Sequence, residues 1–202
     1  MYPESLSRLI RLFSRFPTVG PRTATRFAFY CLNSSKEDVD ELIETLKDVK
    51  KSIRLCNLCF RSISAEKELC SVCENKKRDH SIICVVEKET DLLSIEKTHE
   101  YEGIYFILGG SVSPLKENFK KIRIEELRER IVNHKKFNLP KIKEVIIATN
   151  QNTEGEATAI YLQRILQELK IKTTRLGRGL PTGGEVEYTD EETLVFALRG
   201  RK

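Results

Sequence analysis

Apolar side chains recur at helical spacing through the first 54 residues. A first helix is indicated by the stripe Leu6, Leu9, Ile10, Phe13 and Phe16. A second helix is expected to run through about residue 32. A third is expected over residues 36–54, where Ser34-x-x-Glu37 has the form of a capping box. Its apolar stripe predicts a packing surface and consists of Val39, Leu42, Ile43, Leu46, Val49 and Ile53.

Two apolar runs in the second half of the chain predict buried strands. The first covers residues 81–87 and ends in Glu87, and the second covers residues 145–148. A helix is predicted after the second strand, over residues 156–170. The pattern indicates an α/β domain with a mostly parallel sheet flanked by helices. The carboxyl ends of parallel strands lie at one edge of a sheet, so Glu87 and Asn150 should meet there.

The turn after the second strand is unusually polar and carries Asn150, Asn152, Glu154 and Glu156. Together with Glu87, the two glutamates would place three carboxylates at the sheet edge, which could hold Mg²⁺ weakly. Alternatively, each glutamate is an ordinary solvent-facing acid at a strand end or a helix N-terminus, where the helix dipole favours negative charge. For either Glu87 or Glu156 taken alone, the second interpretation is preferred.

The residues Asn150-Gln-Asn-Thr-Glu-Gly155 resemble the second acidic motif of the Toprim family, in which Asp-x-Asp is followed by Glu-Gly. Toprim enzymes also use a glutamate at the end of an earlier strand for proton transfer, the position of Glu87. Here Asn150 and Asn152 stand where the two aspartates would be. Two neutral amides remove two negative charges from a metal site. The resemblance therefore implies a Toprim scaffold without its chemistry.

Two Cys-x-x-Cys pairs, Cys56/Cys59 and Cys70/Cys73, are separated by ten residues. Each pair can turn around one metal ion, and four thiolates in tetrahedral geometry suit a structural Zn²⁺. Disulfides are the alternative, and a cytoplasmic location argues against them. The other two cysteines, Cys31 and Cys84, are interpreted as small core residues.

Between the first two predicted helices lies Phe16-Pro-Thr-Val-Gly-Pro-Arg-Thr-Ala24, which resembles the turn of a helix-hairpin-helix. Unpaired amides at the start of the second helix can bind phosphate oxygens, and such contacts recognise DNA without reading its sequence. Residues 1–31 hold five arginines and a single acid. An ordinary helical hairpin with a solvated arginine face is the alternative, and DNA binding is preferred. The predicted DNA-binding residues are Val19, Gly20, Arg22, Thr23, Arg26, Arg8, Arg11 and Arg15. Thr18 occupies the position of the first glycine of this turn, so a positive φ there would strain a threonine.

Composition sets limits around these motifs. The chain has 202 residues, 40% of them hydrophobic, and a formal net charge of +5. No apolar run approaches the roughly 20 residues of a membrane span, and the first residues lack the basic and apolar regions of a signal peptide. A cytoplasmic globular protein is expected. Gly177 to Gly184 lacks the Gly-Lys-Ser/Thr end of a phosphate loop and is interpreted as a surface turn.

The order of hairpin, four-cysteine module and Toprim-like domain resembles the bacterial RecR family of recombination-repair proteins. Four parts are expected: a helix-hairpin-helix over residues 1–54, a zinc finger over 55–78, a Toprim-like domain over 79–176 and a C-terminal segment over 177–202 that contacts other subunits. The segment Leu115 to Lys121 departs from the glycine-rich loop common at that place.

This resemblance implies a non-enzymatic mediator that works with RecO and RecF and helps load recombinase onto single-stranded gaps. It also implies a homo-dimer or tetramer that binds gapped, single- and double-stranded DNA. The alternative from a different class is a metal-dependent Toprim nuclease or primase-like enzyme that uses Glu87, Glu154 and Glu156.

Overall fold

The computed structural model describes residues 2–112, 122–177 and 179–201. Contacts divide the chain into two units, Met1–Arg54 and Leu55–Lys202. The finer division of the second unit into three parts stays a prediction. The segment 115–121, expected to depart from the family pattern, lies outside the described residues. No described helix combines the length and the apolar character that crossing a membrane requires.

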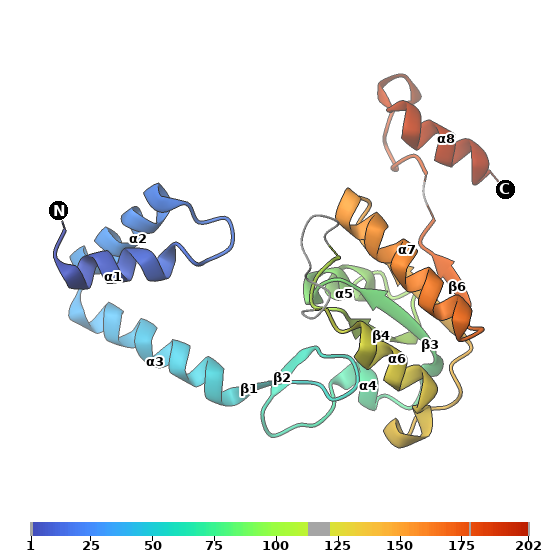
Figure 1. Ribbon diagram of the computed structural model, residues 1–202, viewed down its shortest axis with the longest axis horizontal. Helices are drawn as coiled ribbons and strands as arrows, with labels where there is room; N and C mark the ends of the chain where they lie inside the picture. Colours follow the sequence, from blue (N-terminus) through green and yellow to red (C-terminus); the bar gives the residue numbers. More distant parts are fainter. Residues whose placement is uncertain (1, 113–121, 178, 202) are drawn as a thin grey trace. The chain divides into compact units, whose positions relative to one another are not determined.

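The first unit consists of three helices (Figure 1): α1 (Glu4–Phe13), α2 (Pro21–Asn33) and α3 (Lys36–Ser52). Ala24 and Ala28 are fully buried, and their small side chains allow α1 and α2 to pack closely. The first helix ends three residues earlier than its apolar stripe suggests. Phe16 lies in the turn beyond it and packs edge-on against Phe13, with ring centroids 5.8 Å apart.

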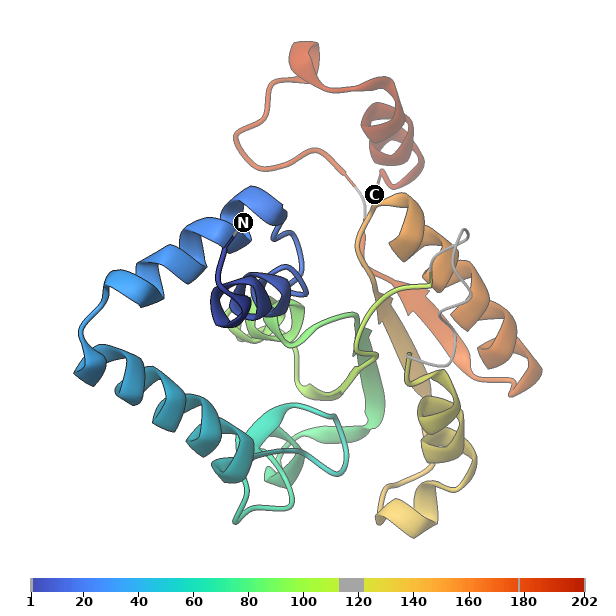
Figure 2. The ribbon, with the colours of Figure 1, turned by 60° about the vertical axis from the view of Figure 1, so that its left-hand side comes forward.

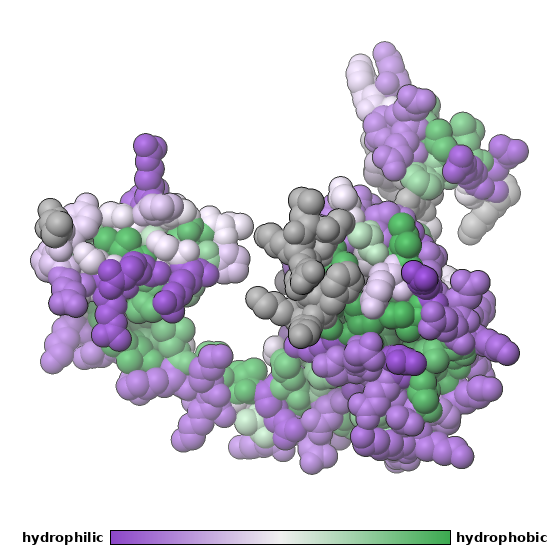
Figure 3. Space-filling view, viewed as in Figure 1, coloured by the Kyte–Doolittle hydropathy of each residue, from purple (hydrophilic) through white to green (hydrophobic). Residues whose placement is uncertain are grey.

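Helix α3 differs from its prediction at its start, and its apolar face is largely exposed. The capping side chain is that of Ser35, which accepts a hydrogen bond from the Asp38 N–H (3.1 Å), and not that of Ser34. None of the helix's residues is buried, and Leu46 is 59% exposed. The described part of this chain therefore does not bury the predicted packing surface, and what packs against it is not shown. An amphipathic pattern shows that a face is apolar, but not what covers it. Figure 3 shows the resulting apolar surface on this unit.

A four-stranded parallel sheet forms the centre of the second unit, in the order β4-β3-β5-β6. Its strands are β3 (Asp79–Val86), β4 (Gly103–Ile107), β5 (Glu144–Ala148) and β6 (Lys172–Arg175). The connecting helices are α5 (Glu89–Glu96), α6 (Ile124–Val132) and α7 (Thr153–Glu168). Right-handed crossovers require α5 on one face and α6 and α7 on the other, as Figures 1 and 2 show. The predicted parallel α/β sheet is confirmed.

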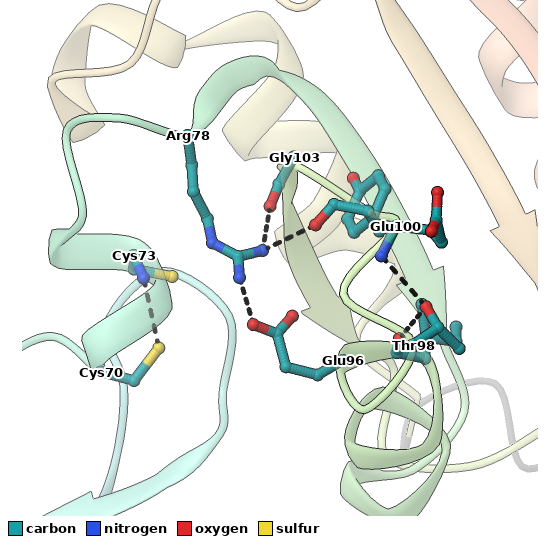
Figure 4. A network of polar contacts seen from close by, with 9 residues as sticks. Cys70, Cys73, Arg78, Glu96, Thr98, Glu100 and Gly103 are labelled. Carbon is teal, nitrogen blue, oxygen red and sulfur yellow. Dashed lines mark hydrogen bonds and ion pairs between the residues drawn. The ribbon is translucent and has the colours of Figure 1, made fainter.

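The cysteine-rich module consists of β1 (Ile53–Leu55), β2 (Ser62–Ser64) and the short helix α4 (Ser71–Glu74). It is joined to the sheet by a hydrogen bond from the Ile107 N–H to the Cys59 carbonyl oxygen (3.0 Å). Arg78, at the end of the module, donates to the carbonyl oxygens of Tyr101 and Gly103 (both 3.1 Å) and pairs with Glu96 (Figure 4). The module and the sheet therefore form one packed unit.

The remaining elements are short. The lysine-rich stretch over residues 134–143 contains a 3₁₀ turn, η2 (His134–Phe137), and then contributes buried Leu139 and Ile142 to the core. The C-terminal segment contains η3 (Val186–Tyr188) and α8 (Glu191–Arg199).

Candidate functional site

The four cysteines of the two Cys-x-x-Cys pairs converge in the small module. Their Sγ atoms all lie within 4.8 Å of one another, and all four residues are buried. The Sγ atoms of Cys59 and Cys70 are 3.5 Å apart, close to the ~3.8 Å between sulfurs in a tetrahedral zinc site. The Cys70 N–H donates to Cys56 Sγ (3.3 Å), and the Cys73 N–H to Cys70 Sγ (3.4 Å; Figure 4). Four soft donors at this spacing fit a structural zinc ion.

The close contact between these thiols also shifts their pKa values in opposite directions. Hydrogen bonding with Cys59 lowers the pKa of the Cys56 thiol, and hydrogen bonding with Cys56 raises the pKa of the Cys73 thiol. Four buried thiols this close cannot all release their protons unless a cation takes up the negative charge. By contrast, burial raises the pKa of the isolated Cys84 thiol to about 12, as expected for an unreactive core residue.

At the carboxyl edge of the sheet, Glu87 and Asn150 are in direct contact, as the ends of two parallel strands predict. Glu87 is only 3% exposed. The Asn150 N–H donates to Glu87 Oε1 (2.8 Å), and Asn150 Nδ2 donates to Oε2 (2.7 Å). The backbone N–H and the side-chain amide of Asn150 thus each donate one hydrogen bond to the buried carboxylate, and an aspartate at this position could supply only the first of them. The site is internally satisfied without a cation.

The other members of the predicted remnant have separate partners. Asn152 is the N-cap of α7, because its Oδ1 accepts from the Gly155 N–H (2.8 Å). The helix therefore begins at Thr153, three residues before the predicted start. A Cβ on Gly155 would lie 2.1 Å from the Asn150 carbonyl oxygen and 2.7 Å from Glu87 Oε1, which explains the glycine of the Glu-Gly pair. Glu154 Oε2 accepts from the Ser111 hydroxyl (3.2 Å).

Glu156 forms a two-pronged ion pair with Arg175, at 2.8 and 2.6 Å. This pair raises the pKa of the Arg175 guanidinium. The three glutamates proposed for weak Mg²⁺ binding therefore contact an amide, a hydroxyl and a guanidinium in turn. Three or more histidine, cysteine, aspartate or glutamate side chains come close enough to share a metal ion at one place among the described residues, the four-cysteine cluster.

The hairpin between α1 and α2 presents its arginines to solvent. Arg8, Arg11, Arg15, Arg22 and Arg26 are all exposed, and within the described part of the chain none of them forms an ion pair. Pro21 is the first residue of α2, so the next two N–H groups are left without helical acceptors.

Thr18 in this turn has φ = +64°, so the strain expected from its position is present. We expect Thr18→Gly to stabilise the first unit by about 0.5–1 kcal/mol, since relief of a strained φ exceeds the extra entropy of glycine. Hydrogen exchange of the α1 and α2 amides measures this. Thr25→Gly, inside α2, should instead destabilise the first unit by about 0.3–0.5 kcal/mol, because glycine has a lower helix propensity than threonine. Equal losses from both variants would contradict the strain at Thr18.

Two buried or paired arginines were not identified from the sequence. Arg130 is 3% exposed and lies on the buried face of α6, three residues after Leu127. A cation at an apolar helical position was the signal that could have revealed it. Arg175 ends β6, the neighbour of β5, and only the strand order shows that it reaches Glu156.

Comparison with known proteins agrees with these features. The sequence matches three protein families. They are described as "RecR, helix-hairpin-helix", matched over residues 6–50, "Toprim domain", matched over 81–177, and "RecR, C-terminal", matched over 179–202. It is 42% identical over 201 residues to "Recombination protein RecR" of Staphylococcus aureus (strain MRSA252), covering 99% of this chain and 98% of that protein. The chain belongs to the RecR family. A second RecR relative, from Bifidobacterium adolescentis, is 43% identical over 202 residues, covering 100% of this chain and 97% of its own length. The names of these RecR relatives support a role in recombinational DNA repair.

Proposed function

We propose that the protein is a non-enzymatic, DNA-binding mediator of recombinational repair that acts with RecO and RecF to load recombinase at single-stranded gaps. Membership of the RecR family supports the pathway. The observation that carries the DNA-binding role is the hairpin turn, where the first turn of α2 has open N–H groups and Arg22 and Arg26, four residues apart on this helix, are exposed. Such a surface favours phosphate groups of any sequence, in gapped, single- or double-stranded DNA.

The non-enzymatic part of the proposal is supported by the sheet edge. Metal-dependent phosphoryl transfer needs clustered carboxylates that a divalent cation can bridge. Here Glu87 accepts both of its close hydrogen bonds from Asn150, and Glu156 is paired with Arg175. These two acids are therefore already hydrogen-bonded by an asparagine and by a guanidinium.

Zinc is proposed as a structural ion held by Cys56, Cys59, Cys70 and Cys73, because four protein ligands leave no open position for catalysis. A homo-dimer or tetramer is proposed because α3 exposes a row of apolar side chains, including Leu42 (46%) and Val49 (50%). The C-terminal segment also exposes Val186 and Leu198 and is proposed as a further subunit contact. A cytoplasmic location is part of the proposal.

Arg22→Ala combined with Arg26→Ala tests the DNA contact. We expect weaker binding on every sequence, and a plot of log affinity against log salt that is about two units flatter for each hairpin engaged, because two phosphate contacts are lost. Binding to labelled gapped DNA over a salt series measures both quantities. A monomeric variant with intact arginines should also bind poorly, because linked hairpins bind with higher effective concentration.

Lys50→Ala combined with Lys51→Ala is the matched control, since it removes the same charge from the last turn of α3. This control should leave the salt dependence nearly unchanged. Full affinity and an unaltered slope in a folded Arg22/Arg26 variant would reject the hairpin as the DNA site. The basic C-terminal tail with Arg199, Arg201 and Lys202 would then be the next candidate.

The enzymatic alternative has a direct test. Purified protein is incubated with Mg²⁺ or Mn²⁺ and labelled gapped DNA, and the products are compared with those of Glu87→Gln. Metal-dependent cleavage or synthesis that Glu87→Gln abolishes would replace the mediator proposal by a nuclease or primase-like function.

A further inference from the structure

A guanidinium lies buried between the cysteine module and the Toprim sheet. Arg130 is 3% exposed, and its Nη2 donates to the carbonyl oxygen of Asn57 (2.7 Å), the residue after Cys56. Its Nε and Nη1 are buried and have no hydrogen-bond acceptor within the described part of the chain. The guanidinium is therefore largely desolvated with two of its donor atoms unused, an arrangement that normally requires a nearby anion.

Aromatic rings surround the same guanidinium. Its central carbon lies 5.0 Å from the ring centre of Phe106, 5.1 Å from that of Phe137 and 5.3 Å from that of Phe60. Cation–π contacts offset part of the lost hydration. They carry no formal negative charge, so they leave the net positive charge of the buried group uncompensated.

The groups that can compensate this charge are the cysteines. The carbonyl group that Arg130 contacts, that of Asn57, lies between Cys56 and Cys59, and no carboxylate in the described part of the chain forms an ion pair with Arg130. The acid next to Arg130 on its own helix is Glu129. Its carboxylate already accepts from Lys136 Nζ at 2.7 Å. Neutral thiols provide no counter-charge, whereas four thiolates around one Zn²⁺ carry two net negative charges.

We propose that Arg130 is the counter-charge of the tetrathiolate zinc site, so that zinc occupancy and the docking of the cysteine module on α6 stabilise each other. This inference rests on the proposed zinc ion. The contacts between the cysteine module and the rest of the second unit agree with it. The Asn57 carbonyl that accepts from Arg130 lies inside the first Cys-x-x-Cys turn, and the Cys59 carbonyl accepts from the Ile107 N–H of β4. Loss of zinc would leave Arg130 as an unpaired buried cation at this joint, and the module would loosen from α6.

The test compares neutral and charged replacements in the full-length protein. Zinc affinity is measured by competition with a chromophoric chelator, and stability by urea unfolding with zinc bound and after removal of zinc under reducing conditions. Arg130→Met and Arg130→Gln should lower zinc affinity by about 10- to 100-fold, the range for groups that support metal ligands. Arg130→Lys should retain most of the affinity, because it keeps the charge.

The stability of the zinc-free protein distinguishes the counter-charge role of Arg130 from a role in packing alone. Without zinc, Arg130→Met should be as stable as the parent or more stable, because an unpaired buried cation has been replaced by an apolar side chain. With zinc, the same variant should be less stable than the parent. The sign of the mutational effect therefore changes with the metal.

Arg123→Met is the matched control. Arg123 lies over the same Phe60 ring, at 4.6 Å, and donates to the Ile107 carbonyl oxygen (3.0 Å). Its replacement should change stability equally with and without zinc and leave zinc affinity unaltered.

Three outcomes decide the matter. Unchanged zinc affinity in Arg130→Met, or in Arg130→Gln should the first variant not fold, would overturn the counter-charge role. Equal destabilisation of Arg130→Met with and without zinc would also overturn it and leave a packing role. A parent protein purified under reducing conditions that contains and binds no zinc would instead reject the proposed metal site itself.

Discussion

Replacing Cys56 by serine is expected to remove zinc and to destabilise the second unit by several kcal/mol. Structural zinc sites in small modules contribute an apparent binding free energy of roughly 10–16 kcal/mol, and a serine hydroxyl is a poor substitute for a thiolate ligand. Cys56 is fully buried, and its Sγ accepts from the Cys70 N–H, so the substitution also weakens the turn that holds the ligands. Zinc content by elemental analysis and urea unfolding measure the two effects.

Cys84→Ser separates loss of the metal from the burial of a hydroxyl. Cys84 is 2% exposed in β3 and lies outside the four-cysteine group. Its replacement should cost about 1–3 kcal/mol and leave the zinc content of the protein unaltered. A Cys56→Ser protein that retained one zinc ion per chain and the stability of the parent would contradict the structural role of the site.

Features that depend on neighbouring residues in the chain could be predicted from the sequence alone. Two Cys-x-x-Cys pairs bring their own ligands together within short turns, so the cysteine cluster could be predicted without the fold. The strain at Thr18 followed from the position of a β-branched residue in a known kind of turn. The Glu87–Asn150 contact needed only one further rule, that parallel strands end at the same edge.

The sequence was insufficient where a residue's environment depends on tertiary neighbours. Arg175 reaches Glu156 because β6 lies beside β5, and neither strand order nor register can be read from the strands alone. The environment of Arg130 depends on where α6 packs. Helix α3 is a further example. Its stripe is apolar, yet no element in the described part of the chain buries it.

One local signal was overlooked. Asn152 followed by acidic residues at the next helical positions is typical of a helix N-terminus, and the structure uses Asn152 as the N-cap of α7. The two asparagines that stand at the aspartate positions of a Toprim motif therefore have different tasks. Asn150 neutralises no charge but donates to Glu87, whereas Asn152 accepts from a helix N–H.

This difference predicts opposite effects for the same substitution two residues apart. Asn150→Asp should destabilise the metal-free protein by about 2–4 kcal/mol, because a donor to the buried Glu87 carboxylate becomes a second carboxylate beside it. Mg²⁺ should restore part of the stability of this variant, because a divalent cation can bridge two acids. The parent should respond little to Mg²⁺. Urea unfolding with and without Mg²⁺ measures both effects.

Asn152→Asp is the matched control, because aspartate caps a helix about as well as asparagine and its charge is favourable at a helix N-terminus. We expect its stability to equal or slightly exceed that of the parent, with or without Mg²⁺. Neither variant should cleave DNA, since Glu156 remains paired with Arg175 and a working metal site needs its surrounding groups in place. Metal-free Asn150→Asp protein as stable as the parent would show that Glu87 does not depend on the amide. Strong Mg²⁺ binding by the unmodified protein would show that its acids still form a metal site.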